Sequence, residues 1–124
     1  EGAKTNIRVN TLAPTARTAM TEGLLPSDAA ELLAPETVTP GLLFLVSENA
    51  PSRVILGAGA GAFAVTHILE TPGVYLPEEE RTPETLAARF AEISNRATAS
   101  PLENAFGQTF KFVSLAAAAR RDRP

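Results

Sequence analysis

The order of segments along this 124-residue chain predicts an α/β fold. A β-rich apolar stretch occupies residues 6–13, and two helical patterns follow within residues 26–47. A second apolar strand comes at residues 53–56, and small helical patterns follow after residue 77. Strand, helix, helix, strand is an incomplete α/β unit, since the first strand lacks an obvious sheet around it.

The first strand is predicted from Ile7, Val9 and Leu12, which lie in the β-rich stretch at residues 6–13. Pro14 fixes φ and ends the strand. Small and hydroxylated side chains follow, so we expect a loop over residues 15–21.

Two helices are expected next. Ser27 is the expected N-cap of the first, which Pro35 stops. The second covers residues 37–47, with Thr39 as the expected cap and Pro40 in the first turn. That helix is apolar nearly all round, which predicts that it is largely buried.

The rest of the chain is predicted in less detail. We expect a strand at residues 63–69, a turn at 71–73 and a short strand at 74–76. Thr82 is the expected cap of a helix that ends near Ser94. Further on, the pattern allows a helical turn at residues 100–103 and either strand or helix at residues 110–115.

Composition excludes several classes of function. A net charge of -3 argues against nucleic acid as the main partner, because phosphate binding needs a concentrated basic face. The absence of cysteine excludes disulfides and thiolate chemistry. No apolar stretch approaches the ~20 residues that a membrane span needs, so we expect no membrane partner. The lack of cysteine fits a reducing compartment, and we expect a cytoplasmic location. The chain opens at Glu1-Gly2 without methionine, and we expect it to be the C-terminal part of a longer protein.

The glycine run at residues 57–62 formally matches the dinucleotide fingerprint G-x-G-x-x-(G/A) after an apolar strand. That mechanism requires a helix next, whose N-terminus holds the pyrophosphate. The residues that follow favour a strand instead. We therefore interpret the glycines as permitting a tight turn and close backbone approach.

Neither a general base nor a metal site is supported. His67 is the only histidine, and no acid or nucleophile lies at a telling spacing from it. Glu78, Glu79 and Glu80 are adjacent rather than spaced for one metal face, so we expect a solvated acidic loop.

The loop after the first strand is a better candidate. Thr15 and Thr18 offer hydroxyls, and we expect the backbone N–H groups between them to lack secondary-structure partners. Open α/β sheets bind ligands at the carboxyl ends of their strands. The residues leave two alternatives open, a ligand-binding loop and a plain connection.

Residues 6–14, Asn-Ile-Arg-Val-Asn-Thr-Leu-Ala-Pro, resemble the strand late in short-chain dehydrogenases/reductases. In that family the strand follows the helix that bears a catalytic Tyr-x-x-x-Lys, whose end Glu1-Gly2 resembles. Residues 53–61 resemble the last core strand and its glycine-rich close. The resemblance implies the C-terminal portion of a Rossmann-like doubly wound parallel sheet over residues 1–76, and a small helical extension and tail over residues 77–124.

The loop departs from the common family pattern, because Thr15 replaces the usual glycine and Met20 comes one residue early. This variant resembles the (3R)-hydroxyacyl-CoA dehydrogenase units of peroxisomal multifunctional enzymes type 2 and their bacterial relatives. The resemblance implies hydride transfer with NAD as cofactor, NADP remaining open, and a lid at residues 24–33 over an acyl substrate such as a CoA thioester. The implied cofactor-binding residues are Pro14, Thr15, Ala16, Arg17, Thr18 and Ala19.

The catalytic Ser-Tyr-Lys set of the family is not in this chain. Tyr75 is the only tyrosine, and Glu79 stands where the family has lysine. The first hypothesis is therefore a dehydrogenase segment completed by a missing N-terminal half and forming a homo-oligomer. The alternative is a non-catalytic oligomerisation or binding module that pairs through residues 53–76, and a different small ligand in the loop is a third reading.

Overall fold

The computed structural model describes residues 2–21 and 23–121, which form two compact units, Glu1–His67 and Ile68–Pro124. The proposed division into residues 1–76 and 77–124 concerns domains of a larger protein and stays a prediction.

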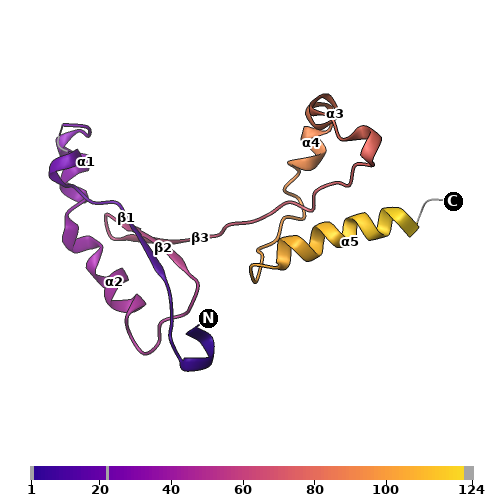
Figure 1. The fold of residues 1–124 in the computed structure, drawn as a ribbon. Coiled ribbons are helices and arrows are strands. Elements are labelled where there is room, and N and C mark those ends of the chain that lie inside the picture. The colour runs from indigo at the N-terminus through magenta and orange to yellow at the C-terminus, as the bar shows by residue number, and fades with distance from the viewer. Residues whose placement is uncertain (1, 22, 122–124) are drawn as a thin grey trace. The chain divides into compact units, whose positions relative to one another are not determined.

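The first unit is built on a three-stranded sheet in the order β1-β2-β3 (Figure 1). β1 (Thr11–Pro14) runs parallel to β2 (Ile55–Gly59), and β2 forms an antiparallel hairpin with β3 (Ala62–Thr66). A mixed α/β unit with a parallel strand pair and helices confirms the predicted fold class of a partial Rossmann-like sheet. The third strand adds an antiparallel edge, which larger parallel sheets commonly carry.

The glycine run forms the end of β2 and the hairpin turn. Gly57, Ala58 and Gly59 lie in β2, and Ala60-Gly61 is a two-residue turn because Gly59 pairs with Ala62. No helix follows the run, so the structural interpretation of the glycines is correct.

The hairpin turn offers a stabilising substitution. Ala60 and Gly61 have φ of 51° and 75°, the left-handed values of a type I′ turn, in which asparagine precedes glycine most favourably. A left-handed alanine costs about 1 kcal/mol. We therefore expect Ala60→Asn to raise the free energy of unfolding by about 1 kcal/mol, as measured by urea denaturation. Gly61→Ala should have the opposite sign, and a destabilised Ala60→Asn variant would contradict the turn assignment.

Two α-helices connect β1 to β2. They are α1 (Ser27–Leu32) and α2 (Thr39–Leu45), joined by the 3₁₀ turn η3 (Pro35–Thr37). Neither predicted cap is present, since Pro26 and Val38 hold the N-cap positions without a side-chain hydrogen bond and the two predicted residues are the first residues of their helices. Proline occupies the first turn of α2, as predicted.

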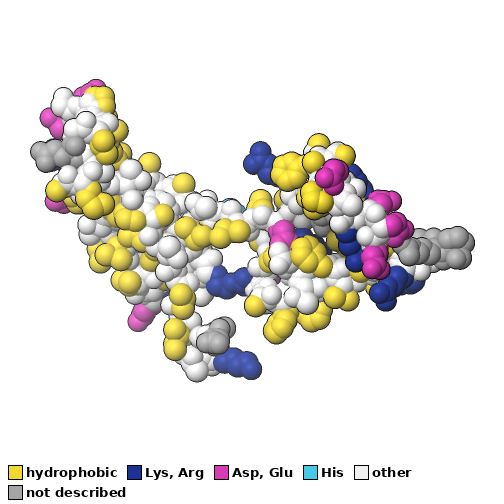
Figure 2. Space-filling view, turned by 45° about the horizontal axis from the view of Figure 1, so that its top comes forward, with side chains coloured by type: hydrophobic (Ala, Val, Ile, Leu, Met, Phe, Trp, Pro, Cys, Tyr) yellow, Lys and Arg dark blue, Asp and Glu magenta, His cyan; other side chains and the backbone are white. Residues whose placement is uncertain are grey.

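α2 packs on the sheet through one face only. Gly41 permits the approach, because a Cβ there would lie 3.1 Å from Phe63 Cε1 and 3.3 Å from Leu56 Cδ2. The core of this unit is small and consists of Val38, Leu45, Ala50, Leu56 and Ala58. The expectation that this helix is largely buried is wrong: within the described part of the unit no second layer covers its outer face, which exposes Leu42, Leu43, Phe44 and Val46. Apolar side chains accordingly reach the surface in Figure 2.

The second unit is helical. A 3₁₀ turn precedes α3 (Pro83–Ala88) and α4 (Phe90–Ile93), and a long helix, α5 (Gly107–Arg121), ends it. Thr82 caps α3 as predicted, accepting a hydrogen bond of 3.2 Å from the Thr85 backbone N–H. The single predicted helix is interrupted at Arg89, which separates α3 from α4.

Of three further expectations for the second unit, two are wrong and one, left open between strand and helix, is decided as helix. The short strand predicted at residues 74–76 and the helical turn at residues 100–103 do not form. Ser100 instead pairs with Glu70 in an isolated antiparallel bridge. Residues 110–115 are helical and belong to α5. Across the described residues, no helix combines the length and the apolar character that a membrane crossing requires.

Candidate functional site

The loop after β1 starts at the carboxyl ends of the two parallel strands. Thr15 continues the strand pairing, because its N–H donates to the Ala58 carbonyl at 2.8 Å. Gly59 makes this approach possible: a Cβ at that position would lie 2.6 Å from the Thr15 carbonyl oxygen and 2.9 Å from Thr15 Cβ. The last glycine of β2 therefore fixes where the loop leaves the sheet.

The loop backbone is more fully bonded than its sequence indicates. The Arg17 N–H donates to the Leu33 carbonyl at 2.7 Å, and the Thr18 N–H donates to the Thr21 hydroxyl at 2.9 Å. The expectation that the N–H groups between Thr15 and Thr18 lack secondary-structure partners is therefore wrong for Arg17, whose acceptor lies at the end of α1. Within the described part of the chain, no acceptor is bonded to the N–H of Ala16 or Ala19.

The loop and the segment predicted as a lid line one hollow of about 540 Å³. Three predicted cofactor-binding residues, Arg17, Thr18 and Ala19, contribute to its lining. The rest of the lining comes from the following turn and α1, namely Thr21, Gly23, Leu25, Ser27 and Ala30. The structure thus brings together two segments that sequence analysis had assigned to cofactor and substrate.

The other predicted residues lie beside this hollow. Thr15 lines a smaller hollow of about 260 Å³ together with Leu33 and residues of β2 and β3. Pro14 is the last residue of β1, and neither Pro14 nor Ala16 lines either hollow.

The larger hollow has a polar and an apolar part. Its polar lining residues are Arg17, Thr18, Thr21 and Ser27, and Leu25 and Ala30 supply the apolar part. The Ala19 N–H, which has no acceptor within the described residues, suits the phosphate and amide groups of a dinucleotide together with the hydroxyl and guanidinium side chains of these residues. The residues present therefore fit the implied NAD.

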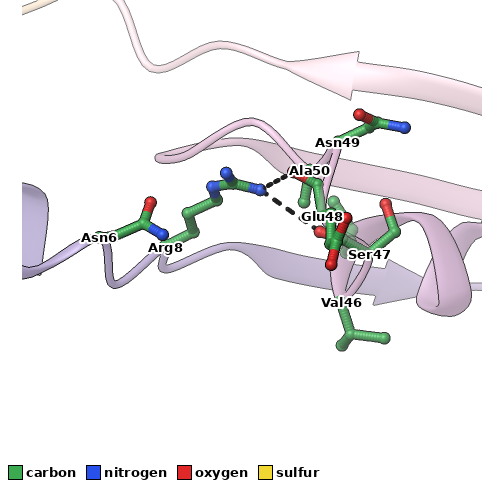
Figure 3. A pocket seen from close by; sticks show the side chains of 8 residues that line it. Asn6, Arg8, Val46, Ser47, Glu48, Asn49 and Ala50 are labelled. Atoms are coloured by element: carbon green, nitrogen blue, oxygen red, sulfur yellow. Dashed lines mark hydrogen bonds between the residues drawn. The ribbon is translucent and has the colours of Figure 1, made fainter.

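Two residues that the sequence pattern did not single out, Arg8 and Asn10, bond the chain before β1 to the chain between α2 and β2. Asn10 donates through Nδ2 to the Pro51 carbonyl at 2.8 Å and accepts at 3.0 Å from the Val54 N–H. Arg8 donates to the carbonyls of Ser47 and Glu48, just beyond α2, in the hollow that Figure 3 shows. The available signal was that both polar residues alternate with apolar ones inside a predicted strand.

The histidine, the tyrosine and the acidic residues considered from the sequence lie outside the hollow between the loop and α1. His67 is exposed and follows β3. The Tyr75 hydroxyl accepts from the Arg81 guanidinium at 3.4 Å, and that guanidinium lies 5.8 Å from the tyrosine ring centre. Among residues 2–21 and 23–121, no three His, Cys, Asp or Glu side chains gather as a metal site.

In the second unit, an ion pair joins α5 to Glu70, near the start of the unit. Lys111 pairs with the Glu70 carboxylate and donates to the Thr71 carbonyl at 2.7 Å, and Gln108 also donates to Glu70. The hydrogen bond from Lys111, with a second from Gln108, lowers the pKa of Glu70 below its ordinary value.

This lowered pKa predicts a pH dependence of stability. A carboxyl whose pKa is lower in the folded state stabilises the fold above its unfolded pKa, and that contribution is lost as the pH falls through the folded pKa. We expect the difference in Tm between the wild type and Glu70→Gln to be constant above the ordinary carboxyl pKa of 4.5 and to shrink below it. Melting curves between about pH 7 and about pH 3 test this. A Tm difference that does not depend on pH would contradict the ion pair.

Among known proteins, the chain is similar to segments of dehydrogenases and of multifunctional peroxisomal enzymes. No protein-family model matches the chain. A peroxisomal hydratase-dehydrogenase-epimerase of Saccharomyces cerevisiae is 37% identical over 98 residues, covering 77% of this chain and 11% of that protein. A putative short-chain type dehydrogenase/reductase of Mycobacterium tuberculosis is 35% identical over 96 residues, covering 77% of this chain and 33% of that protein. The chain is therefore similar, over 77% of its length, to a segment of a short-chain type dehydrogenase/reductase.

Further similarities agree with this relationship. Peroxisomal multifunctional enzyme type 2 of Mus musculus is 35% identical over 103 residues, which cover 81% of this chain and 14% of that protein. In fold, the full-length peroxisomal multifunctional enzyme type 2 of Drosophila melanogaster matches 98% of this chain and 22% of its own, with a TM-score of 0.79 and 19% identity. The resemblance inferred from residues 6–14 is thereby confirmed.

The chain spans between 11% and 33% of the length of the relatives named first. The names of the multifunctional relatives place those proteins in peroxisomes. The cytoplasmic location that we expect for this chain differs from the location in those names and stays a prediction.

Proposed function

We propose that the chain supplies the nicotinamide-side loop and the substrate lid of an NAD(P)-dependent short-chain dehydrogenase. The substrate would be a 3-hydroxyacyl-CoA or a similar hydroxy or keto compound. The observation that carries the proposal is the shared hollow of about 540 Å³, lined by the loop after β1 and by the segment around α1. The names of the related proteins, which include dehydrogenases of multifunctional peroxisomal enzymes, support the reaction class.

The cofactor would lie along residues 14–19. Backbone N–H groups of Ala16 and Ala19 are available as donors, and the Thr18 hydroxyl has no hydrogen bond within the described residues. The dinucleotide, when bound, supplies the hydride chemistry. The work of this chain is to orient the dinucleotide and, through α1, to keep water from the reacting carbon.

The proton-transfer groups are proposed to lie outside these 124 residues. Tyr75 has glutamate in place of the family's lysine, and its hydroxyl already accepts from Arg81. We therefore expect no turnover from this chain by itself, and activity from the full-length gene product.

Substitution of Thr18 tests the cofactor contact. In the full-length protein, Thr18→Val should raise the KM for NAD about 3- to 10-fold, because one hydrogen bond contributes about 0.5–1.5 kcal/mol. Thr18→Ser should restore the wild-type KM. Thr66→Val, which removes an exposed hydroxyl at the end of β3, is the matched control. An unchanged KM for Thr18→Val would restrict the role of Thr18 to its backbone.

A second candidate function, an oligomerisation module, is favoured by the apolar side chains that the edge strand β3 leaves partly exposed. Phe63 and Val65 are 47% and 50% exposed in an element that usually buries such side chains. Under this reading the chain forms an oligomer and gains no thermal stability from NAD(H). A clear rise in Tm with NAD(H) would favour the dehydrogenase proposal instead.

A further inference from the structure

Arg17 occupies a distinctive place in the hollow between the loop and α1. Among the described residues that line this hollow, it is the only charged one. Its backbone is fixed by the 2.7 Å hydrogen bond to Leu33. Its side chain is exposed and makes no ion pair or hydrogen bond with the described residues. Arg17 therefore brings to the lining a fixed backbone and a cationic side chain that has no bonding partner among the described residues.

The surroundings of this guanidinium favour an anion. Thr18 and Ser27 line the same hollow, and neither of their hydroxyls has a hydrogen bond within the described residues. Asp28 and Glu31, the acidic residues of α1, are not part of that lining. A guanidinium beside free hydroxyls, with no carboxylate in the described lining, matches the oxygens of a phosphate group.

We propose that Arg17 binds the diphosphate of the ligand in this hollow. The planar fork of an arginine can donate two parallel hydrogen bonds to phosphate oxygens, which lysine does not reproduce. The inference rests on the proposed function, since a diphosphate is common to NAD(H) and to CoA thioesters. Arg17 is thus a binding residue that selects ligands by their diphosphate.

Calorimetric titration of the full-length protein tests the proposal without relying on turnover. The ligands are NADH, CoA and pantetheine, which lacks the diphosphate of CoA. Arg17→Gln should raise the Kd for at least one diphosphate ligand about ten-fold or more, since hydrogen bonds to charged groups are strong. Arg17→Lys should recover only part of the affinity, and the Kd for pantetheine should not change. Lys4→Gln is the matched control, because Lys4 lies exposed in η1 (Gly2–Thr5), at the other end of its unit from α1 (Figure 1).

The outcomes show whether the diphosphate that Arg17 binds belongs to NADH or to CoA. A rise confined to the Kd of NADH identifies the cofactor as the ligand of Arg17, and a rise confined to CoA identifies the substrate. Unchanged Kd values for both, or the same rise in Lys4→Gln, would overturn the proposal. If the wild type oxidises a 3-hydroxyacyl-CoA with NAD while Arg17→Gln binds normally, only this inference fails. Arg17-dependent binding of CoA without any such oxidation would instead remove the proposed function.

Discussion

Gly59→Ala is expected to destabilise the protein by about 1–3 kcal/mol and to weaken NAD(H) binding. The added Cβ would lie 2.6 Å from the Thr15 carbonyl oxygen, and backbone cannot yield as a flexible side chain does. The loop must therefore move away from β2, which breaks the hydrogen bond from Thr15 to Ala58. Urea denaturation and NADH titration of the full-length protein measure the two effects.

Gly57→Ala is the matched control for this substitution. It adds the same methyl group to the same strand, but there the new Cβ would meet the Ala64 carbonyl at 3.5 Å, an ordinary contact. We expect near wild-type stability and an unchanged Kd for NADH. Equal effects of the two substitutions would show that the close approach of Thr15 to β2 does not position the loop.

Asn10→Ala is expected to lower the free energy of unfolding by about 2 kcal/mol. Its side-chain amide serves both the Pro51 carbonyl and the Val54 N–H, next to the start of β2. Truncation leaves both backbone groups without a partner in a half-buried place, which costs more than the hydrogen bonds themselves contributed. Chemical denaturation of the full-length protein gives the difference in free energy.

Two further variants isolate the amide of Asn10. Asn10→Asp keeps an acceptor for the Val54 N–H but sets a carboxylate against the Pro51 carbonyl, so we expect it to restore little stability. Asn49→Ala removes an exposed asparagine without a side-chain hydrogen bond among the described residues, and we expect no change in stability. A stable Asn10→Ala variant would contradict the bridging role.

The local sequence predicts which helices and strands form better than it predicts the residues at which they begin and end. β1 begins at Thr11 rather than at residue 6, because the preceding backbone bonds to other groups. The Val9 carbonyl accepts from the Arg53 N–H, and the Val9 N–H donates to the Ser52 hydroxyl. Such pairings join residues more than forty positions apart, and no local pattern predicts them.

In the loop site, too, the local sequence indicates the residues but not the contacts that depend on the fold. The hydroxylated sequence after Pro14 leaves a ligand loop and a plain connection open, and three of its residues, Arg17, Thr18 and Ala19, line a hollow. Which N–H groups remain available depends on Leu33 and Thr21, whose positions follow only from the fold. The tertiary role of Gly59 is equally hidden, because its missing side chain matters only where Thr15 passes.

Amide hydrogen exchange at Ala16 and Ala19, measured in the full-length protein with and without saturating NADH, tests most directly whether this loop holds the cofactor. Their N–H groups have no acceptor within the described residues, whereas those of Arg17 and Thr18 are already bonded. We predict that NADH slows exchange at Ala16 and Ala19 and changes it little at Arg17 and Thr18. Exchange at Ala16 and Ala19 that stays the same with NADH bound would contradict the assignment of the loop.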